Sequence, residues 1–599
     1  MDLTDYKNQV KNLSINEQKL RDLYLRDIAL GKIQGPMTGY ASLDKPWLKF
    51  YKEEFIKSEI PHMCAFEYFE QMNKSNMDKL AIDCSIQGKF TYAEFTAEYY
   101  KLAKAMYAVG IRKGDKSLFV LPPMALESML FYASNLVGAA ISGLPEYTPT
   151  QEICNAINEL GIDNLFIFDS VFSEMREKEL YEKTNLKNII YYGKNKKYYC
   201  NQTISYVDFL QRGKNVELPQ IARTPEDLLF IARTGGSTGK PKSVMLNSNS
   251  FNIAVHEYLN SDLLYRRGDH WLRLWALFSA TAAVSNSHLP LSSGMVNIIR
   301  PFPMNIFEFD KIVDDVKPNH LMLIPQLLDI LEQSELLKDQ NLDYIKTVGC
   351  GGIAINNEFE YKVDRFLKSH NINTYLGYGW GCTENATSAA MRSSYETTKI
   401  GCVGVPLVKT IVSVFDLNTR QELPYGEVGE LCINSPTYMA GYYNDSVLTN
   451  EVLKRHEDGS VWLHTGDLGV MDKDGFVTVK GRMTKTIFVF PTAKIYYNDL
   501  EEIISKANGV LQIVISQIPD EEHQNFAYPI CFIVPKPGYS FEKVRKNVEK
   551  ICSISLSEYA RPKLICIKEE IPLLPSGKPN EDLLKQELMK GISFTKRLK

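Results

Sequence analysis

Short apolar runs alternate with helix-like stretches along most of the chain. From Thr91 onward, runs such as 117–121 (SLFVL) and 164–168 (NLFIF) are separated by helical patterns such as YAEFTAEYYKLAKAMYAVG. Such alternation is typical of α/β proteins, in which crossover helices join parallel strands. The pattern therefore predicts an α/β fold built on a parallel sheet.

The pattern changes after Val405. Short strands separated by Gly, Asp and Asn turns, as in IVSVFD, GELCIN and VWLHTGD, predict a β-rich subdomain over 406–482. Residues 483–599 combine two strands with several helices, which predicts a small α+β domain, and residues 1–50 predict a helical N-terminal extension. We therefore expect a large domain over 51–482 followed by the small C-terminal domain.

Composition narrows the function classes. The 599 residues are 44% hydrophobic and 23% charged with a net charge of -4, as in an ordinary soluble enzyme with no strong attraction to nucleic acid. The eleven cysteines are scattered without a CxxC pair, which favours reduced thiols and a cytoplasmic location. The N-terminus has no signal-peptide core, and the most apolar stretch, 128–144, predicts a buried helix running into a strand. No transmembrane segment is expected.

A glycine-rich loop carries the first sign of chemistry. Residues 234–243, TGGSTGKPKS, follow the apolar run LLFIA, and their N–H groups, hydroxyls and lysines could converge on a polyphosphate such as ATP. A solvated Gly/Ser turn is the plain alternative. A Walker A loop would need four residues between its glycines and Ser or Thr after its Lys. Here Gly235 and Gly239 enclose three residues and Pro241 follows the lysine, so the chain does not carry that motif.

Together with five further segments, the loop resembles the nucleotide loop of the adenylate-forming superfamily, which includes acyl-CoA synthetases, aryl-CoA ligases, fatty acyl-AMP ligases and peptide-synthetase adenylation domains. The segments follow in the family's order: VGCGGIAI, GWGCTE, GEVGELCINSPTYMAGYYN, WLHTGDLGVMDKDGFVTVKGR and LPSGK. Six motifs in order over 66–584 are hard to attribute to chance. The resemblance implies a large domain of two α/β subdomains and a β-rich subdomain, with the small α+β domain as a mobile lid.

The resemblance also implies a reaction. In such enzymes a carboxylate attacks the α-phosphate of ATP, pyrophosphate leaves, and a pantetheine thiol of CoA or of an acyl carrier protein captures the acyl-adenylate. Charge gathers on the α-phosphoryl oxygens, so the site must supply donors, a lysine and Mg²⁺ in a water-poor cleft. No carrier domain follows in this sequence, so any carrier protein is expected to be a separate chain.

The motifs imply roles for single residues. Glu384 would ligate Mg²⁺ with a hard carboxylate oxygen, Thr383 would contact the α-phosphate, and Trp380 would stack on adenine where the family usually has tyrosine. Asp467 would accept the ribose hydroxyls, and Arg482 would reach the ribose or a phosphate. The other implied ATP-binding residues are Thr234, Gly235, Gly236, Ser237, Thr238, Gly239, Lys242, Gly351, Gly352 and Ile353.

Lys578 is the implied catalytic lysine. In LPSGKPN it lies on a glycine-containing loop, from which its charge could swing onto the carboxylate and α-phosphate oxygens. Without the resemblance it would be an ordinary exposed turn lysine. Rotation of the small domain about a hinge at Thr484 and Lys485 would alternate adenylation with thiol capture.

One loop departs from the family pattern. Where relatives have a glycine beside pantetheine, this chain offers Pro491 and Thr492, which have neither the freedom nor the small size of glycine. Two interpretations stay open. Either a carrier protein presents its arm differently, or the enzyme stops at the adenylate.

The segment 271–294 is implied to form the acid pocket. It contains no Asp or Glu, so a buried α-ammonium would lack a counter-charge, and a fatty or aryl acid is favoured over an α-amino acid. The small, weakly polar run 279–283 could leave space for an acyl chain or aromatic ring, or could simply pack a helix. The implied pocket residues are Ala276, Leu277, Thr281 and Gly379.

Two other functions fit the same motifs. A degenerate ligase could bind nucleotide or acyl groups without turnover because the phosphate and pantetheine loops are altered, although Glu384 and Lys578 are retained. An adenylate-dependent oxygenase of the luciferase type shares the fold, and oxygen consumption or light emission would reveal it.

Overall fold

The structure, a computed structural model, describes most of the chain: residues 37–168, 173–193, 200–234, 242–301, 308–352, 355, 357–489, 493–520, 527–556, 558–574 and 579–591. The chain divides into two compact units. The first comprises residues 1–413, 432–465 and 471–477, and the second comprises residues 414–431, 466–470 and 478–599. The boundary expected after Arg482 stays a prediction, as does the extension over 1–50, of which residues 1–36 lie outside the described ranges.

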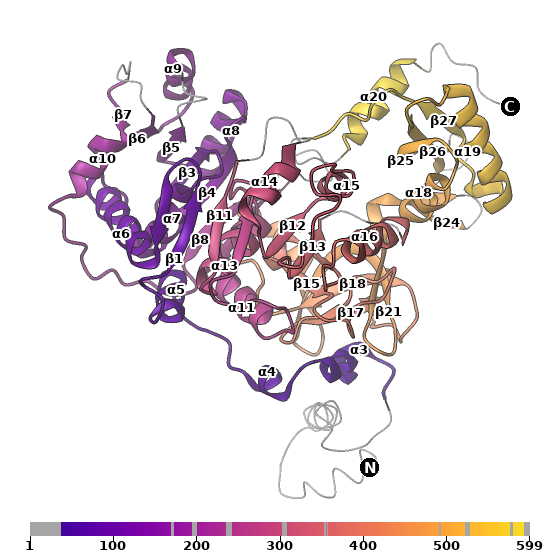
Figure 1. Cartoon of the computed structure of the whole chain (residues 1–599), viewed down its shortest axis with the longest axis horizontal. Coiled ribbons are helices and arrows are strands. Elements are labelled where there is room, and N and C mark those ends of the chain that lie inside the picture. The colour runs from indigo at the N-terminus through magenta and orange to yellow at the C-terminus, as the bar shows by residue number, and fades with distance from the viewer. Residues whose placement is uncertain are drawn as a thin grey trace, which may run out of the picture. The chain divides into compact units, whose positions relative to one another are not determined.

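One sheet of the first unit has eight strands in the order β19-β9-β8-β4-β3-β5-β6-β7 (Figure 1). Strands β8, β4, β3, β5, β6 and β7 run parallel, and the antiparallel strands β9 and β19 follow β8 at the edge. The bounds are β3 (Lys116–Leu121), β4 (Ala140–Pro145), β5 (Asn164–Phe168), β6 (Asn188–Tyr192), β7 (Thr203–Ser205), β8 (Leu228–Thr234), β9 (Lys242–Asn247) and β19 (Gly441–Tyr442).

The other large sheet of this unit has nine strands in the order β16-β15-β14-β13-β12-β10-β11-β1-β2. Its centre, from β1 to β14, is parallel, and β2, β15 and β16 are antiparallel to their neighbours. The bounds are β1 (Leu80–Cys84), β2 (Gly88–Thr91), β10 (His270–Arg273), β11 (Val296–Ile299), β12 (His320–Leu323), β13 (Thr347–Gly351), β14 (Leu376–Gly381), β15 (Ser388–Met391) and β16 (Val405–Pro406).

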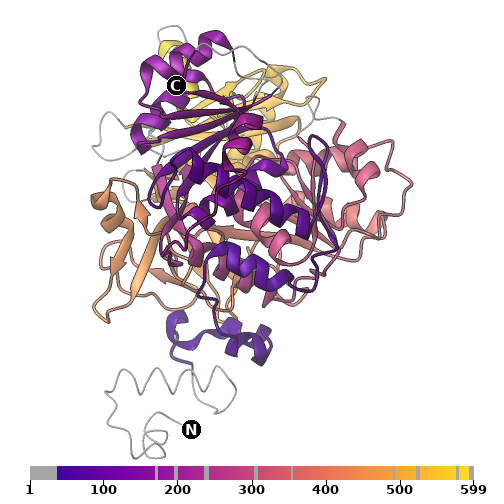
Figure 2. The same ribbon diagram turned by 90° about the vertical axis from the view of Figure 1, so that its left-hand side faces the viewer.

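Helices connect the strands of both sheets, as the alternating pattern predicts. Helix α6 begins after Thr91. The Thr91 hydroxyl accepts a hydrogen bond from the Glu94 N–H, and the Glu94 carboxylate accepts one from the Thr91 N–H. Helices α6 and α7 lie side by side (Figures 1 and 2). The helices of this unit are α3 (Ala41–Asp44), η1 (Pro46–Phe50), α4 (Glu53–Lys57), α5 (Ala65–Asn73), α6 (Tyr92–Ala108), α7 (Ala125–Val137), α8 (Thr150–Leu160), α9 (Glu174–Lys183), α10 (Tyr206–Gly213), α11 (Ser248–Leu259), α12 (Ala280–Ala283), η3 (Val284–His288), α13 (Leu289–Ser292), α14 (Phe309–Val316), α15 (Pro325–Glu332), α16 (Asn357–Ser369), η5 (Thr383–Asn385) and α17 (Ser446–Val452).

The apolar stretch 128–144 is confirmed as a buried helix running into a strand. Every residue of α7 is buried, the helix ends at Gly138 in the left-handed conformation, and β4 follows directly. Phe69, Phe95 and Tyr132 of the helices α5, α6 and α7 meet with ring centroids 4.8 to 5.7 Å apart in the main hydrophobic core. In the part of the chain that the structure describes, no helix is both long and apolar enough to cross a bilayer.

The remaining sheets follow the change of pattern after Val405. A five-stranded sheet has the order β17-β18-β21-β20, with β22 paired to β21, and the second unit also holds a two-stranded sheet β23-β24 and a three-stranded sheet β25-β26-β27. These results confirm the predicted α/β class with a β-rich part and an α+β C-terminal part. The bounds are β17 (Ile411–Phe415), β18 (Gly429–Asn434), β20 (Leu453–Arg455), β21 (Val461–Met471), β22 (Val477–Arg482), η6 (Met483–Lys485), β23 (Thr486–Val489), β24 (Ala493–Tyr496), α18 (Tyr497–Ser505), β25 (Val510–Pro519), β26 (Ala527–Pro535), α19 (Phe541–Ser555), η7 (Glu558–Ala560), β27 (Leu564–Ile567) and α20 (Glu581–Gly591).

All eleven cysteines lie within the described ranges, and none of them forms a disulfide bond. Eight are buried, and Cys200, Cys382 and Cys566 are partly exposed. Burial raises the pKa of the Cys64 thiol to about 11. A raised pKa keeps a thiol protonated and unreactive near neutral pH, so this cysteine serves as a small core residue.

A buried carboxyl makes the stability of the first unit depend on pH. Glu257 Oε1 accepts from the Lys409 N–H (3.0 Å) and from the Thr410 hydroxyl (2.9 Å), whereas the buried Oε2 has no hydrogen-bond partner among the described residues. Burial raises the pKa of Glu257 from 4.5 to about 7, and the bonds from Thr410 and Lys409 offset only part of that rise. The folded protein therefore binds a proton that the unfolded chain releases between these two pH values.

The stability is expected to fall as the pH rises through this window, because the folded-state pKa lies above the unfolded value. In the Glu257→Gln variant, the new side chain cannot ionise. Its free energy of unfolding should therefore fall less between about pH 5 and pH 8 than that of the wild type, by about 3 kcal/mol. Urea unfolding across this pH range measures the difference. If the free energy of unfolding depends on pH in the same way in both proteins, the assignment of the raised pKa to Glu257 is wrong.

Candidate active site

Two of the nucleotide motifs lie at the carboxyl ends of neighbouring parallel strands. Strand β13 ends at Gly351, β14 ends at Gly381, and Gly351 is paired with Gly379. Ligands of open α/β sheets bind outside the carboxyl ends of the strands. The structure therefore brings together the motifs GCGG and GWGCTE at an edge where a nucleotide can bind.

Paired glycines leave part of the sheet without side chains at this place. Gly349 is paired with Gly377 and Gly351 with Gly379, so all four occupy the same face of β13 and β14. Among the described residues, only backbone atoms lie within 4 Å of a Cβ built on Gly351 or Gly377. A Cβ on Gly379 would lie 2.8 Å from the Ser388 hydroxyl. A flat ligand group can therefore approach the backbone at Gly351, a position predicted for adenine, whereas the side chains of Met322 and Ser388 fill the space beside Gly349 and Gly379.

The aromatic residue predicted to stack on adenine is largely enclosed. Trp380 is 8% exposed and is paired with Ala390 of β15, and the pairing is irregular between Trp380 and Gly381. Gly352 has a φ of +80°, a conformation that favours glycine and turns the chain away from β13. Ile353 lies outside the described residues, so the adenine contacts of this motif stay a prediction.

Thr383 and Glu384 form the short helix η5 directly after β14. The Glu384 carbonyl accepts from the Met439 N–H (2.8 Å), and its carboxylate Oε1 accepts from the Tyr442 hydroxyl (2.6 Å). Two bonds from the same chain segment thus fix both the backbone and the side chain of Glu384. This carboxylate is partly exposed, and carboxylate oxygens are the ligands that Mg²⁺ prefers.

Tyr442 links Glu384 to the glycine-rich loop. Tyr442 lies on β19, which pairs with β9, and the Lys242 ammonium stands 5.2 Å from the centre of its ring. Lys242 is itself paired with Thr234 across β8 and β9, so residues 235–241 connect these two strands. The loop residues Gly235, Gly236, Ser237, Thr238 and Gly239 lie outside the described residues.

The structure thus brings Thr234, Lys242 and Glu384 to one corner through Tyr442. This residue is a functional candidate that sequence reasoning missed, although it lies inside the motif segment SPTYMAGYYN. A carboxylate held by a neutral hydroxyl beside a lysine fits a bound cation and a phosphate chain.

The predicted ribose residues meet within the second unit. Arg482 Nε donates to Asp467 Oδ1 at 2.7 Å, with Asp467 largely buried and Arg482 exposed. Lys485 of the turn η6, one of the two predicted hinge residues, forms an ion pair with Glu581 at the start of α20. The hinge residue Thr484 lies in the same turn.

The predicted catalytic lysine lies outside the described residues, but both flanks of its loop are paired. Leu573 and Pro579 form an antiparallel bridge, and the Asn580 N–H donates to the Pro572 carbonyl at 2.7 Å. These contacts join the described residues that precede and follow Lys578 in the chain. Pro491 and Thr492 of the predicted pantetheine loop also lie outside the described residues.

The four predicted acid-pocket residues differ in exposure. Ala276 and Leu277 are 4% and 2% exposed, whereas Thr281 is exposed on the helix α12. Gly379 lies on β14, and the Ser388 hydroxyl covers the place where its side chain would stand. The Ser279 hydroxyl accepts from the Ala282 N–H and so starts α12 within the pocket segment.

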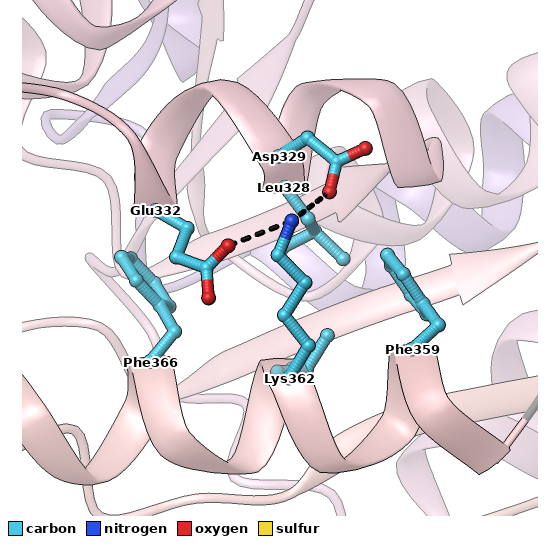
Figure 3. A pocket seen from close by; sticks show the side chains of 7 residues that line it. Leu328, Asp329, Glu332, Phe359, Lys362 and Phe366 are labelled. Atoms are coloured by element: carbon cyan, nitrogen blue, oxygen red, sulfur yellow. Dashed lines mark hydrogen bonds and ion pairs between the residues drawn. The ribbon is translucent and has the colours of Figure 1, made fainter. Parts of the chain in front are cut away.

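A small surface pocket between α15 and α16 contains none of the predicted site residues. Figure 3 shows Lys362 at its centre, bound to Asp329 and to Glu332 (2.7 Å), with Phe359 and Phe366 on either side. The two carboxylates neutralise the lysine, so the pocket offers no strong recognition group for the ligands of the predicted reaction.

Comparisons with known proteins agree with these motifs. The sequence profile of the AMP-binding enzymes matches residues 69–443, and that of the AMP-binding enzyme C-terminal domain matches residues 499–578. A long-chain-fatty-acid–CoA ligase of Salmonella typhimurium is 25% identical over 510 residues, covering 80% of this chain and 86% of the relative. A 4-coumarate–CoA ligase of Solanum tuberosum is 24% identical over 538 residues, covering 88% and 94%.

Solved structures show the same fold. The anthranilate CoA ligase AuaEII in complex with anthranoyl-AMP superposes with a TM-score of 0.77 at 18% identity, covering 89% of this chain and 98% of that one. ATP-bound MatB from Rhodopseudomonas palustris gives a TM-score of 0.75 at 19% identity, covering 88% and 99%.

Proposed function

The chain belongs to the AMP-binding enzyme family, and from that premise we propose that it is an ATP- and Mg²⁺-dependent ligase that joins a fatty or aryl acid to the thiol of CoA through an acyl-adenylate. The observation that carries the proposal is the corner formed by Glu384, Tyr442 and Lys242. In this corner a carboxylate that could bind a cation and an ammonium that could bind a phosphate lie near the paired ends of β8 and β9, which supports the proposal.

Each residue of this corner has a separate task. Glu384 would hold Mg²⁺, which neutralises charge on the phosphates of ATP when it is bound. Tyr442 keeps the Glu384 carboxylate in place by its 2.6 Å hydrogen bond. The Lys242 ammonium would bind the β- and γ-phosphates, and the Thr383 hydroxyl would donate a hydrogen bond to the α-phosphate. This division favours pyrophosphate as the leaving group, because negative charge on both sides of the breaking bond is balanced.

The second unit would complete the reaction. Lys578 supplies a point charge to the reacting carboxylate and α-phosphate, while Asp467 and Arg482 bind the ribose. Turning of the C-terminal domain at Thr484 and Lys485 would then exchange this lysine for the thiol. The two units would in this way perform adenylation and thiol capture in turn.

A fatty or aryl acid is the favoured substrate for two reasons. The relatives reported above are named for long-chain fatty acids and 4-coumarate. In addition, the pocket residues Ala276 and Leu277 are apolar, and the segment 271–294 carries no acidic side chain that could pair with an α-ammonium.

The acceptor is tested by product analysis. The enzyme is incubated with ATP, Mg²⁺ and a panel of fatty, aryl and amino acids, with CoA or with a pantetheinylated carrier protein, and the products are identified by mass spectrometry. We expect acyl-CoA from a fatty or aryl acid. Acyl transfer to the carrier protein but not to CoA would show that the acceptor is a separate carrier protein. Acyl-AMP as the only product would indicate an adenylate-only enzyme. Bound nucleotide without any product would indicate the degenerate ligase, and oxygen consumption or light would indicate the oxygenase.

A further inference from the structure

A buried ion pair joins the start of the acid-pocket segment to the helix α7. Arg273 is the last residue of β10, and Glu127 lies in the first turn of α7, 146 positions earlier in the chain. Both side chains are fully buried and form an ion pair. Neither residue belongs to a motif of the resemblance, so the pair is a property of this chain's packing.

Both members of the pair also bind the backbone of the pocket segment. Glu127 Oε1 accepts from the Leu277 N–H at 2.8 Å, and Arg273 Nε donates to the Trp275 carbonyl at 3.0 Å. The two bonds hold the chain on either side of Ala276. The placement of this pocket residue is therefore set by one ion pair.

The same network reaches a helical turn further along the pocket segment. Arg273 Nη1 donates to the Ser128 hydroxyl at 3.1 Å, and this hydroxyl is 2.8 Å from the hydroxyl of Ser287. Ser287 lies in η3, a π-helical turn, and such turns are rare and frequent at functional sites. The ion pair and its hydrogen bonds thus connect the end of β10 with η3, on the two sides of Ala276 and Leu277.

The close packing leaves this segment no room to shift. A Cβ built on Gly143 of β4 would lie 3.0 Å from the Leu277 carbonyl oxygen and would overlap the edge of the Phe119 ring. The lack of a side chain at Gly143 therefore lets the Leu277 backbone lie against β4. A hydrogen-bonded clamp on one side and a tight strand on the other define the position of Leu277.

Stability alone does not account for such a pair. Transfer of both charges from water is costly, and burial accordingly raises the pKa of Glu127 to about 7 and lowers the pKa of Arg273. Apolar residues of similar volume often stabilise a core as well or better. What apolar residues cannot supply is the set of directed bonds to Trp275 and Leu277.

We propose that the Glu127–Arg273 pair is a positioning pair that sets the affinity for the carboxylic acid and leaves the affinity for ATP unchanged. The proposal rests on the proposed function, because it assumes that Ala276 and Leu277 line the acid pocket. Neither side chain touches the substrate. The pair acts through the backbone that it holds.

The test separates positioning from stability by removing the charges singly and together. The single variants Glu127→Gln and Arg273→Met each leave one buried charge without its partner, so their melting temperatures should fall. The double variant, Glu127→Leu with Arg273→Met, leaves no such charge, and its melting temperature should recover. Its KM for the acid should nevertheless stay raised by about tenfold or more, with the KM for ATP within about twofold of the wild type.

The matched control is Glu257→Gln, which alters another fully buried carboxyl that accepts a backbone N–H, in this case the N–H of Lys409 and none in the pocket backbone around Ala276. Its KM for the acid should equal that of the wild type. If the KM for the acid recovers together with the melting temperature in the double variant, or if both KM values rise together, the proposal is wrong. A wild-type enzyme that is folded but inactive with every acid would instead refute the proposed function. In that case, equal binding of a non-hydrolysable acyl-adenylate analogue by the wild type and the double variant would also overturn the positioning role.

Discussion

Replacing Glu384 with glutamine is expected to lower the rate of acid-dependent pyrophosphate release by about a hundredfold, with a weaker apparent affinity for Mg²⁺. The amide keeps the size of the side chain and can still accept the Tyr442 hydrogen bond, but it removes the charge that a hard cation requires. A titration with Mg²⁺ at saturating ATP and acid measures both effects. This loss of rate is the largest that we expect for a substitution in the first unit, because the Glu384 carboxylate is the predicted metal ligand.

Two further variants give this prediction its controls. Tyr442→Phe keeps the ring beside Lys242 and loses the bond to Glu384, so its rate should fall by about tenfold. Glu257→Gln makes the same chemical change at a buried carboxyl outside the site and should retain normal turnover near neutral pH. If the Glu384→Gln enzyme has the wild-type rate and the wild-type dependence on Mg²⁺, then Glu384 is not a metal ligand.

Replacing Lys578 with alanine is expected to lower adenylation by about two to three orders of magnitude while sparing thiol capture. The lysine charge is needed when negative charge collects on the α-phosphoryl oxygens, and it has no such task once the acyl-adenylate exists. Adenylation is followed by pyrophosphate release. Thiol capture is followed separately by supplying synthetic acyl-adenylate and CoA to the enzyme.

Lys585→Ala is the matched control, because Lys585 lies on α20 seven residues beyond Lys578 and carries the same charge. This variant should keep both half-reactions. Equal losses in both half-reactions of Lys578→Ala would point to a structural defect of the C-terminal domain. Unchanged adenylation would show that another residue provides the charge.

Local patterns predicted the elements well because each depends on neighbouring residues. The apolar run 128–144 correctly predicted the buried helix α7 and the strand β4, and the strands 510–519 and 527–535 follow their apolar runs. The order of strands in the two large sheets was not contained in such patterns. It results from pairings between distant segments, such as β1 with β11, which packing of the whole unit decides.

The same distinction applies to the site. Glu384 and Thr234 could be predicted from their motifs, but the side chain that links them, Tyr442, becomes evident only when β19 pairs with β9. The absence of acidic residues from 271–294 is correct for the sequence, yet α7 brings Glu127 onto the Leu277 N–H from outside the segment. Contacts between residues so far apart have no local sequence signal.

The measurement that tests the central claim most directly is exchange of labelled pyrophosphate into ATP. The account predicts exchange that requires Mg²⁺ and a fatty or aryl acid, and that is largely lost in Glu384→Gln and Lys578→Ala. The exchange reports adenylation whichever thiol accepts the acyl group. A folded wild-type protein that binds ATP but shows no exchange with any acid of the panel would contradict the account.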